Sequence, residues 1–337
     1  MLLALVILLL VEFAFRLPLR GQLLGALEIT GTVTALMVVT AVLDLSGYPL
    51  RVARRITRSG FSPFLVLSAA LAAILMNDTA LFLVVPLTLR LSKEKGYDPA
   101  KAVALITAAV NVGSALTAFG NPQNIMIWRM DCASIPEFSR VMLPYCLAGL
   151  IVLLVLSRIL IGEGATAGEH PPPRSRPELL LLGSALLVMD LVLIETGNWP
   201  IALALSIGLT APLERYAVAK INPRILLMIF LVVLDLRALS TVVPVSMFSG
   251  RGLLTYVWIL MLCQLMGNVP ATSLFLGSVD WRILAPLVNL GGLGLVTASL
   301  ANLIALRLSA VEPLKFQKWS LLILLLCALA FLPLFFL

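Results

Sequence analysis

One stretch of the chain decides the fold, because it is polar and breaks the helix in the middle of a long apolar run. It reads Asn111-Val112-Gly113-Ser114-Ala115-Leu116-Thr117-Ala118-Phe119-Gly120-Asn121-Pro122-Gln123-Asn124. Gly120 permits a break, Asn121 is a favourable N-cap and Pro122 suits the first position of a helix. We therefore expect a half-helix to restart at Pro122 deep in a membrane. Its positive end attracts an anion, and the carbonyls that end the preceding helix suit Na⁺.

The composition of the whole chain is that of a membrane protein. Its 337 residues are 61% hydrophobic and 12% charged, and the mean hydropathy is +1.06, whereas soluble domains are about 25% charged. A spanning helix takes roughly 20 apolar residues, so there is room for about ten such elements and for little else. These numbers predict an all-α polytopic membrane protein with the lipid bilayer as its partner. They exclude a soluble catalytic domain and a globular nucleic-acid binder.

The apolar runs give a map of the membrane spans. Two segments, 61–91 and 251–278, are interrupted by polar residues at Asn77-Asp78-Thr79 and at Asn268-Val269-Pro270. Each is expected to form a re-entrant hairpin, two short helices that enter and leave on one membrane face. The remaining runs are expected to cross the membrane, and they cover 1–19, 22–45, 98–128, 138–160, 178–196, 199–213, 224–245, 282–307 and 319–337.

The basic residues orient this map. With the loop at 46–60 on the inside, 17 of the 24 lysines and arginines lie in inside loops and seven lie outside. Because lysine and arginine accumulate on the cytoplasmic side, we expect a cytoplasmic N-terminus in a protein of the cell membrane. The same rule explains the net charge of +7 without an acidic partner.

The two halves of the sequence resemble each other. Asp44 precedes Asn77 by the same interval as Asp235 precedes Asn268. Further along, Asn111 and Asn124 have the same spacing as Asn289 and Asn302. The offset between the halves is constant on each side of the loop at 91–101 and becomes smaller across that loop, which the second half lacks. The odd number of crossings between matched spans predicts an inverted repeat, which is typical of secondary transporters with broken helices.

This repeat divides the chain into three parts. We expect a first, N-terminally shortened repeat at 1–160, a cytoplasmic linker at 161–177 and a second repeat at 178–337. Two re-entrant hairpins and two broken helices, at 98–128 and 282–307, then meet near the membrane midplane. In the second half, Ser299 occupies the position of Asn121 and is expected to cap the matching half-helix.

Carboxylates within spans indicate ion or proton pathways, because they are costly in a bilayer. Asp78 is the first candidate, since at a hairpin tip it can titrate or coordinate Na⁺. Glu28 and Asp190 are further candidates for proton or cation coupling, with packing or a bond to a hydroxyl group as the alternative. No role is assigned to Glu12, and snorkelling or a loop position is open for Asp44 and Asp235. The four cysteines lack metal-ligand spacing and His170 is the single histidine, so we expect no metal beyond Na⁺ and no cofactor.

The expected binding residues gather at the hairpin tips and helix breaks. Backbone polar groups at such places must be buried in protein or line a wet cavity. The residues assigned to substrate and ion binding are Asn77, Asp78, Thr79, Asn111, Gly113, Ser114, Thr117, Gly120, Asn121, Pro122, Asn124, Asn268, Pro270, Thr272, Asn289, Gly291, Gly292, Thr297, Ser299 and Asn302.

The motifs Asn77-Asp78-Thr79 and Asn111 to Asn124 resemble those of the ion transporter superfamily. This superfamily holds arsenite permeases, NhaD-type sodium–proton antiporters and citrate and divalent-anion–sodium symporters. The run from Asn111 to Asn124 is similar to the arsenite-permease and NhaD-like branch. The resemblance implies a homodimer of inverted repeats that moves by an elevator-like step and is coupled to Na⁺ or H⁺.

These observations predict a secondary active transporter without catalytic residues. It is expected to move a small anion of the arsenite or carboxylate type, or to exchange Na⁺ and H⁺, by cation-coupled alternating access. A passive ion or solute channel is the alternative, because paired half-helices with Asn-Pro at a break also occur in water channels. An intramembrane enzyme with two aspartates is a remote alternative.

Overall fold

The computed structural model describes residues 19–57, 60–130, 134–161, 175–240, 250 and 252–336. Within these ranges the regular structure is helical, apart from one isolated β-bridge between Leu276 and Val279. The expected span at 1–19 up to residue 18, with Glu12, lies outside the described residues. So do 162–174 of the linker, 241–245 of the expected span 224–245, and the side chain of Asp235.

Four helices in the described ranges are long and apolar enough to cross a membrane. They are α2 (Leu19–Leu45), α8 (Ile135–Leu160), α9 (Pro177–Glu195) and α17 (Pro313–Phe336). Their outward faces carry large apolar side chains, such as Leu24 and Ile159 at 76% and 71% exposure. In water this surface would be unstable, so the all-α polytopic membrane fold is confirmed.

Both expected hairpins are pairs of helices that break at the predicted tips. The first pair is α4 (Phe61–Leu75) and α5 (Asn77–Lys95), and the second is α13 (Leu253–Met266) and α14 (Asn268–Phe275). One residue separates the helices of each pair, and it has positive φ, 62° at Met76 and 94° at Gly267. A residue in this conformation ends a helix, so each second helix begins at the asparagine of its tip.

The expected spans 98–128 and 282–307 are each broken into two helices. The first contains α6 (Pro99–Ser114) and α7 (Pro122–Met130), and the second contains α15 (Trp281–Gly291) and α16 (Leu300–Ser309). The unwound segment of the second also holds a short 3₁₀ turn, η2 (Val296–Ala298). Asn121 caps α7 by accepting a hydrogen bond from the Asn124 amide at 2.9 Å. Ser299 caps α16 by accepting one from the Ala301 amide at 3.2 Å.

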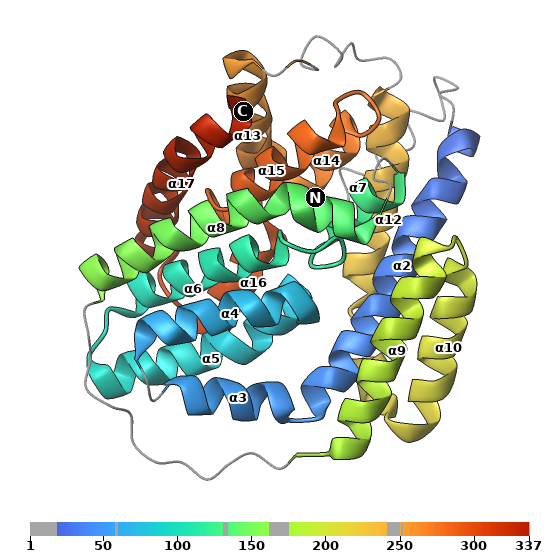
Figure 1. Ribbon diagram of the computed structural model, residues 1–337, viewed down its shortest axis with the longest axis horizontal. Coiled ribbons are helices and arrows are strands. Elements are labelled where there is room, and N and C mark those ends of the chain that lie inside the picture. The colour runs from blue at the N-terminus through green and yellow to red at the C-terminus, as the bar shows by residue number, and fades with distance from the viewer. Residues whose placement is uncertain are drawn as a thin grey trace.

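The remaining helices surround α2. These are α10 (Trp199–Leu213), α11 (Arg215–Ala219) and α12 (Pro223–Ser240), and α2 packs against α9, α10 and α12. Figure 1 shows α2, α9 and α10 side by side, with α4, α5 and α6 gathered on the other side of α2. Residues 46–60, which we expected to be a loop, contain α3 (Tyr48–Thr57). Because the segment is rich in arginine, the sequence analysis did not recognise this short amphipathic helix.

Close helix approach explains two glycines of the predicted site. A Cβ atom at Gly113 of α6 would lie 2.0 Å from the Ala69 carbonyl oxygen of α4. A Cβ atom at Gly291, the matching residue of α15, would lie 2.5 Å from the Cys263 Cβ atom of α13. Both glycines therefore pack a broken helix against the first helix of the adjacent pair, and neither contributes a side chain to binding.

Candidate functional site

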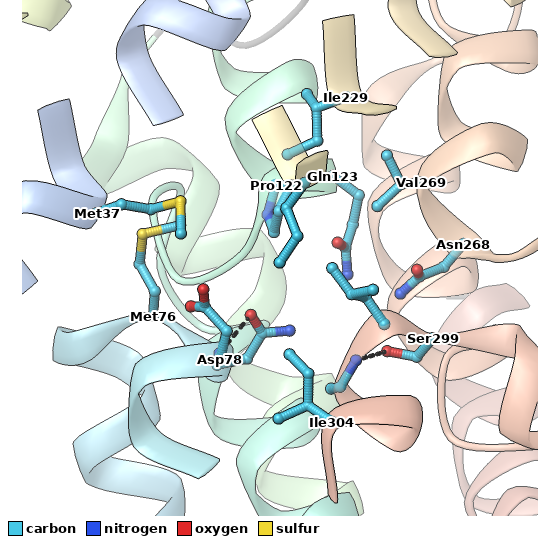
Figure 2. A pocket seen from close by; sticks show the side chains of 14 residues that line it. Met37, Met76, Asp78, Pro122, Gln123, Ile229, Asn268, Val269, Ser299 and Ile304 are labelled. Carbon is cyan, nitrogen blue, oxygen red and sulfur yellow. Dashed lines mark hydrogen bonds between the residues drawn. The ribbon is translucent and has the colours of Figure 1, made fainter. Parts of the chain in front are cut away.

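A cavity lies where four helices begin. Its walls include the first two residues of each helix, and Figure 2 shows side chains from these helix ends around one space. The residues are Asn77 and Asp78 of α5, Pro122 and Gln123 of α7, Asn268 and Val269 of α14, and Leu300 and Ala301 of α16. The helices come from both halves of the chain, so the cavity lies between the halves.

The charge around this cavity is unusual for a membrane interior. Helix N-termini carry a partial positive charge, and four of them reach the cavity. The lining includes no lysine or arginine among the described residues, and Asp78 is its only carboxylate. Apart from Ser299, the N-cap of α16, the rest of the wall is apolar, with Met37 from α2 and with Ile225 and Ile229 from α12. This arrangement offers an anion a fixed positive field and places one titratable group beside it.

The cavity is closed down in this conformation. Its volume is about 20 Å³, on a scale on which one water molecule needs roughly 10–15 Å³. A dehydrated ion fits this space, whereas a carboxylate substrate requires the walls to separate.

Asp78 brings to the cavity a carboxylate whose hydrogen bonding is incomplete. Its Oδ1 atom is buried and has no hydrogen-bond partner in the described part of the chain. The backbone around it is fixed, because the Asp78 amide donates to Asn77 Oδ1 at 2.9 Å and the Asn77 amide donates to the Gly120 carbonyl at 2.9 Å. The tip of one helix pair is therefore tied to the unwound segment of the broken helix, and the carboxylate keeps an open coordination position.

Four asparagines join the two broken helices reciprocally. Asn111 Nδ2 donates to Asn302 Oδ1 at 3.2 Å, and Asn289 Nδ2 donates to Asn124 Oδ1 at 2.7 Å. Each residue in one bond is related to its counterpart in the other by the same offset along the chain. All four side chains are buried, with at most 6% exposure. The predicted asparagines are therefore brought together, as a bridge between the two unwound segments.

The same asparagines hold the unwound backbone of their own halves. Asn124 Nδ2 lies 3.2 Å from the Ser114 carbonyl and 2.9 Å from the Thr117 carbonyl. Asn302 Nδ2 lies 3.0 Å from the Gly292 carbonyl and 2.9 Å from the Leu295 carbonyl, which are the positions matched by the offset of the repeat. The carbonyls expected to be open to Na⁺ thus already accept hydrogen bonds from an amide.

A hub at Asn289 links this bridge to the cavity. Asn289 Oδ1 accepts from Asn121 Nδ2 at 2.9 Å and from Gln123 Nε2 at 3.3 Å. Asn121 Nδ2 also lies 3.2 Å from Ser114 Oγ. Gln123 lines the cavity. A change in the hydrogen bonding of Gln123 can therefore affect the asparagine bridge through the side chain of Asn289.

Other predicted residues have roles away from the cavity. Glu28 forms an ion pair with Arg129 at 2.6 Å, and Asp190 accepts a hydrogen bond from Ser206. Neither acid is among the residues that line the cavity. Thr79 contacts Thr40 through the hydroxyl groups at 3.3 Å.

The remaining predicted hydroxyl residues bond to the backbone. Thr117 donates to the Ala73 carbonyl at 2.8 Å, and Thr272 donates to the Asn268 carbonyl at 2.8 Å. Thr297 donates to the Gln264 carbonyl at 3.4 Å from an exposed position. Pro270, Gly120 and Gly292 are not part of the cavity lining. These residues lie outside the lining of this cavity.

Two glutamines were missed by the sequence analysis. Gln123 was quoted within the deciding stretch, and its position directly after Pro122 could have indicated a helix-start side chain. Gln264 of α13 donates to the Gly291 carbonyl at 2.7 Å and accepts from the Leu295 amide at 2.7 Å. Its signal was a polar side chain inside an apolar run. The apolar residues of the cavity wall, such as Met37, Ile225 and Ile229, could not be recognised from the sequence as part of a site.

The described residues hold no group of three or more histidine, cysteine, aspartate or glutamate side chains suited to a metal ion. The three described cysteines, Cys146, Cys263 and Cys327, are free and buried.

Comparison with known proteins supports a membrane transport role for such a site. The sequence model of a family described as citrate transporter matches residues 1–336. The inner membrane protein YbiR of Escherichia coli K12 is 34% identical over 295 residues, which cover 82% of this chain and 78% of that protein. The uncharacterized transporter MJ0456 of Methanocaldococcus jannaschii is 28% identical over 74% of this chain and 70% of its own length. An arsenical pump membrane protein of Escherichia coli is 25% identical over 53% of this chain and 42% of its own length.

Proposed function

Because the chain belongs to the citrate transporter family, and is thus an integral membrane transporter of the citrate and arsenical permease type, we propose what it moves and how. It moves a small anion, of the carboxylate or arsenite type, across the cell membrane by secondary active transport. The anion binds in the cavity between the four helix N-termini, and Asp78 carries the coupling proton.

The observation that carries this proposal is the composition of the cavity wall. Four helix N-termini and one carboxylate face a space that lacks lysine and arginine among the described residues. An anion gains from the helix ends and is repelled by ionised Asp78, because both charges lie in a medium of low dielectric constant. Binding of the anion therefore favours protonation of Asp78, so the anion and the proton are transported together.

The choice of H⁺ over Na⁺ rests on the unwound segments. Na⁺ sites in transporters of this kind use unwound backbone carbonyls. Here Asn124 and Asn302 donate their amide protons to those carbonyls. A buried carboxylate with an unpartnered oxygen needs only a proton to lose its charge.

The symmetry of the contacts supports alternating access. Reciprocal asparagine bonds at a constant offset support an inverted repeat with halves at 1–160 and 178–337 joined by a linker at 161–177. In such transporters one structural unit rocks or slides against the rest and exposes a midplane site to either side. We place the N-terminus in the cytoplasm and pair the chain as a homodimer in this scheme.

The experiment uses the full chain in proteoliposomes that contain a pH-sensitive dye. An inward gradient of citrate or arsenite is applied without Na⁺, and proton movement and anion uptake are recorded together. We expect saturable anion uptake with proton movement, trans-stimulation by the same anion, and loss of the proton signal in Asp78→Asn. Asp190→Asn serves as the matched control, because its carboxylate lies outside the cavity, and it should keep coupled transport.

Three results would overturn the proposal. A Na⁺ pulse that drives saturable proton efflux through Asp78, with no anion uptake, would make the protein a sodium–proton exchanger. Uptake without saturation or trans-stimulation would make it a channel. Coupled transport that persists in Asp78→Asn would remove Asp78 from the mechanism.

A further inference from the structure

The residue between α4 and α5 is a methionine in a backbone conformation that glycine normally occupies. Met76 has φ 62° and ψ 152°, in a region of backbone space that is essentially restricted to glycine. Gly267 holds the matched position between α13 and α14, with φ 94° and ψ 155°. A glycine therefore makes the same tip without strain, and the strain in the first half is the cost of a side chain.

The surrounding structure holds this strained residue in place. Strain of this kind persists only where neighbouring contacts fix the backbone. On one side of Met76, the Asn77 amide donates to the Gly120 carbonyl at 2.9 Å, and the Met76 carbonyl itself accepts from the Ala80 amide at 3.0 Å. The backbone at the tip is thus fixed, and so is the direction in which the Met76 side chain leaves it.

The Met76 side chain forms part of the cavity wall. It is 1% exposed, and Met37 of α2 lines the cavity with it. Figure 2 shows the two methionine side chains pointing toward each other, on the side of the cavity where Asp78 lies. Gly267 is not part of the lining, so only the first tip adds this bulk to the cavity.

The bulk of Met76 matches one functional group of a substrate. A methionine side chain has as many non-hydrogen atoms as a carboxymethyl group. The space left beside it is about 20 Å³. In alternating access the site opens to one side at a time, so the walls must close around the bound substrate. The size of the wall side chains therefore limits the size of the substrate that can be enclosed.

We propose that Met76 is a specificity-determining residue, which together with Met37 restricts the cavity to anions with a single charged group. This inference rests on the proposed function, because it concerns the substrate of the same cavity. The helix N-termini attract an anion, and the two methionine side chains exclude one that carries a further carboxymethyl group. Arsenite is accepted on this basis, and di- and tricarboxylates such as succinate and citrate are refused.

The test compares the uptake of arsenite, succinate and citrate by the full chain in proteoliposomes. Met76→Gly removes the side chain and keeps the backbone conformation that Gly267 adopts. We expect it to raise the ratio of succinate to arsenite uptake by about tenfold or more, since a pocket discriminates by about 10–200-fold per methylene group. Met76→Leu keeps the number of side-chain atoms and should keep the wild-type ratio.

Further variants separate the size of the cavity from the stability of the protein. Met76→Ala also removes bulk but retains a Cβ atom in the strained conformation. It should raise the uptake ratio as Met76→Gly does and unfold at a lower temperature than Met76→Gly. Met142→Ala removes a methionine of α8 that is also 1% exposed and lies outside the cavity lining, so it should keep the wild-type ratio. Met37→Ala enlarges the same wall from within a helix, and the ratio should rise there even if Met76→Gly yields little monodisperse protein.

The outcomes distinguish this inference from the proposed function. Arsenite uptake with an unchanged ratio in Met76→Gly and Met37→Ala overturns the inference and leaves the proposed function in place. Rapid uptake of citrate by the wild type, or an equal rise of the ratio in Met142→Ala, has the same meaning. A wild-type protein that takes up none of the three anions overturns the proposed function, and this inference with it.

Discussion

The two helix pairs around the cavity share a backbone plan and differ in chemistry. α5 begins Asn77-Asp78-Thr79, whereas α14 begins Asn268-Val269-Pro270. Both follow a residue of positive φ, and both face an unwound segment whose carbonyls are held by an asparagine amide. The first half brings a carboxylate to the cavity, and the second half brings a valine at the matched position.

This difference separates two requirements of a membrane site. Every unwound segment in a bilayer must satisfy its backbone groups, so both halves need the asparagine, and both have it. A single proton needs a single carboxylate, so the acid is required in one half only. Four variants test this division, and they are ordered here by the size of the expected effect.

The largest effect is expected from Gly113→Ala. The added Cβ atom would meet the Ala69 carbonyl oxygen at 2.0 Å, and backbone cannot move aside. We expect a loss at or above the roughly 3 kcal/mol typical of severe overpacking, seen as little monodisperse protein. The matched Gly291→Ala meets the Cys263 side chain instead, so it should be milder and be partly rescued by Cys263→Gly. Equal loss of stability in Gly113→Ala and Gly291→Ala, without rescue by Cys263→Gly, would contradict this steric explanation.

Val269→Asp gives the second half the acid of the first. Two unit charges about 6 Å apart repel by roughly 3 kcal/mol at an effective dielectric constant of about 20. We therefore expect anion affinity about a hundredfold weaker in equilibrium binding measurements at neutral pH, with recovery at low pH. Val269→Asn is the neutral control and should bind nearly as the wild type does. Unchanged affinity in Val269→Asp would show that the anion does not occupy this cavity.

Removal of Asn289 is expected to cost more than removal of Asn111. Asn289 bonds to Asn121, Gln123 and Asn124, whereas within the described residues the Asn111 side chain makes one bond, to Asn302. Leaving buried groups unpaired costs about 1–3 kcal/mol each. We expect Asn289→Ala to lower the unfolding free energy by about 3 kcal/mol and Asn111→Ala by about 1 kcal/mol, measured by unfolding in mixed micelles. A larger loss of unfolding free energy for Asn111→Ala than for Asn289→Ala would contradict the central role assigned to Asn289.

The smallest effect is expected from Ser299→Ala. Loss of a serine N-cap costs about 1 kcal/mol, and the Ser299 hydroxyl accepts only from the Ala301 amide among the bonds described. Asn121→Ala, the matched change, should cost more because Asn121 also bonds to Ser114 and Asn289. Ser299→Thr keeps the hydroxyl and should restore the thermal midpoint. A cost for Ser299→Ala equal to that for Asn121→Ala would show that capping dominates at both positions.

Local patterns in the sequence were enough to locate the breaks. Gly120, Asn121 and Pro122 mark the restart of α7, and Ser299 was placed by the offset of the repeat. The helix tips at Asn77 and Asn268 also begin where polar residues interrupt apolar runs. These features depend on caps and φ preferences of single residues, so they can be read without knowledge of distant contacts.

Features that depend on distant contacts could not be predicted in the same way. Glu28 meets Arg129 across 101 positions of the chain, and no spacing rule joins them. The apolar wall from α2 and α12 looks like any other lipid-facing or core surface in sequence. The helix α3 was hidden because arginines at short spacing are also typical of loops, and its buried face depends on packing against α2, α4 and α5.

The asparagine bridge has a consequence for how the protein is made. Its bonds join residues 191 and 165 positions apart. A ribosome that adds about 5–20 residues per second needs roughly 10–40 seconds to make such a stretch. During this time Asn111 Nδ2 and Asn124 Oδ1 wait in the membrane without their final partners, at the cost of unpaired polar groups in hydrocarbon. The centre of the molecule is therefore completed late during biogenesis, and truncated chains that end before Asn289 should be recognised by membrane quality control as unfinished.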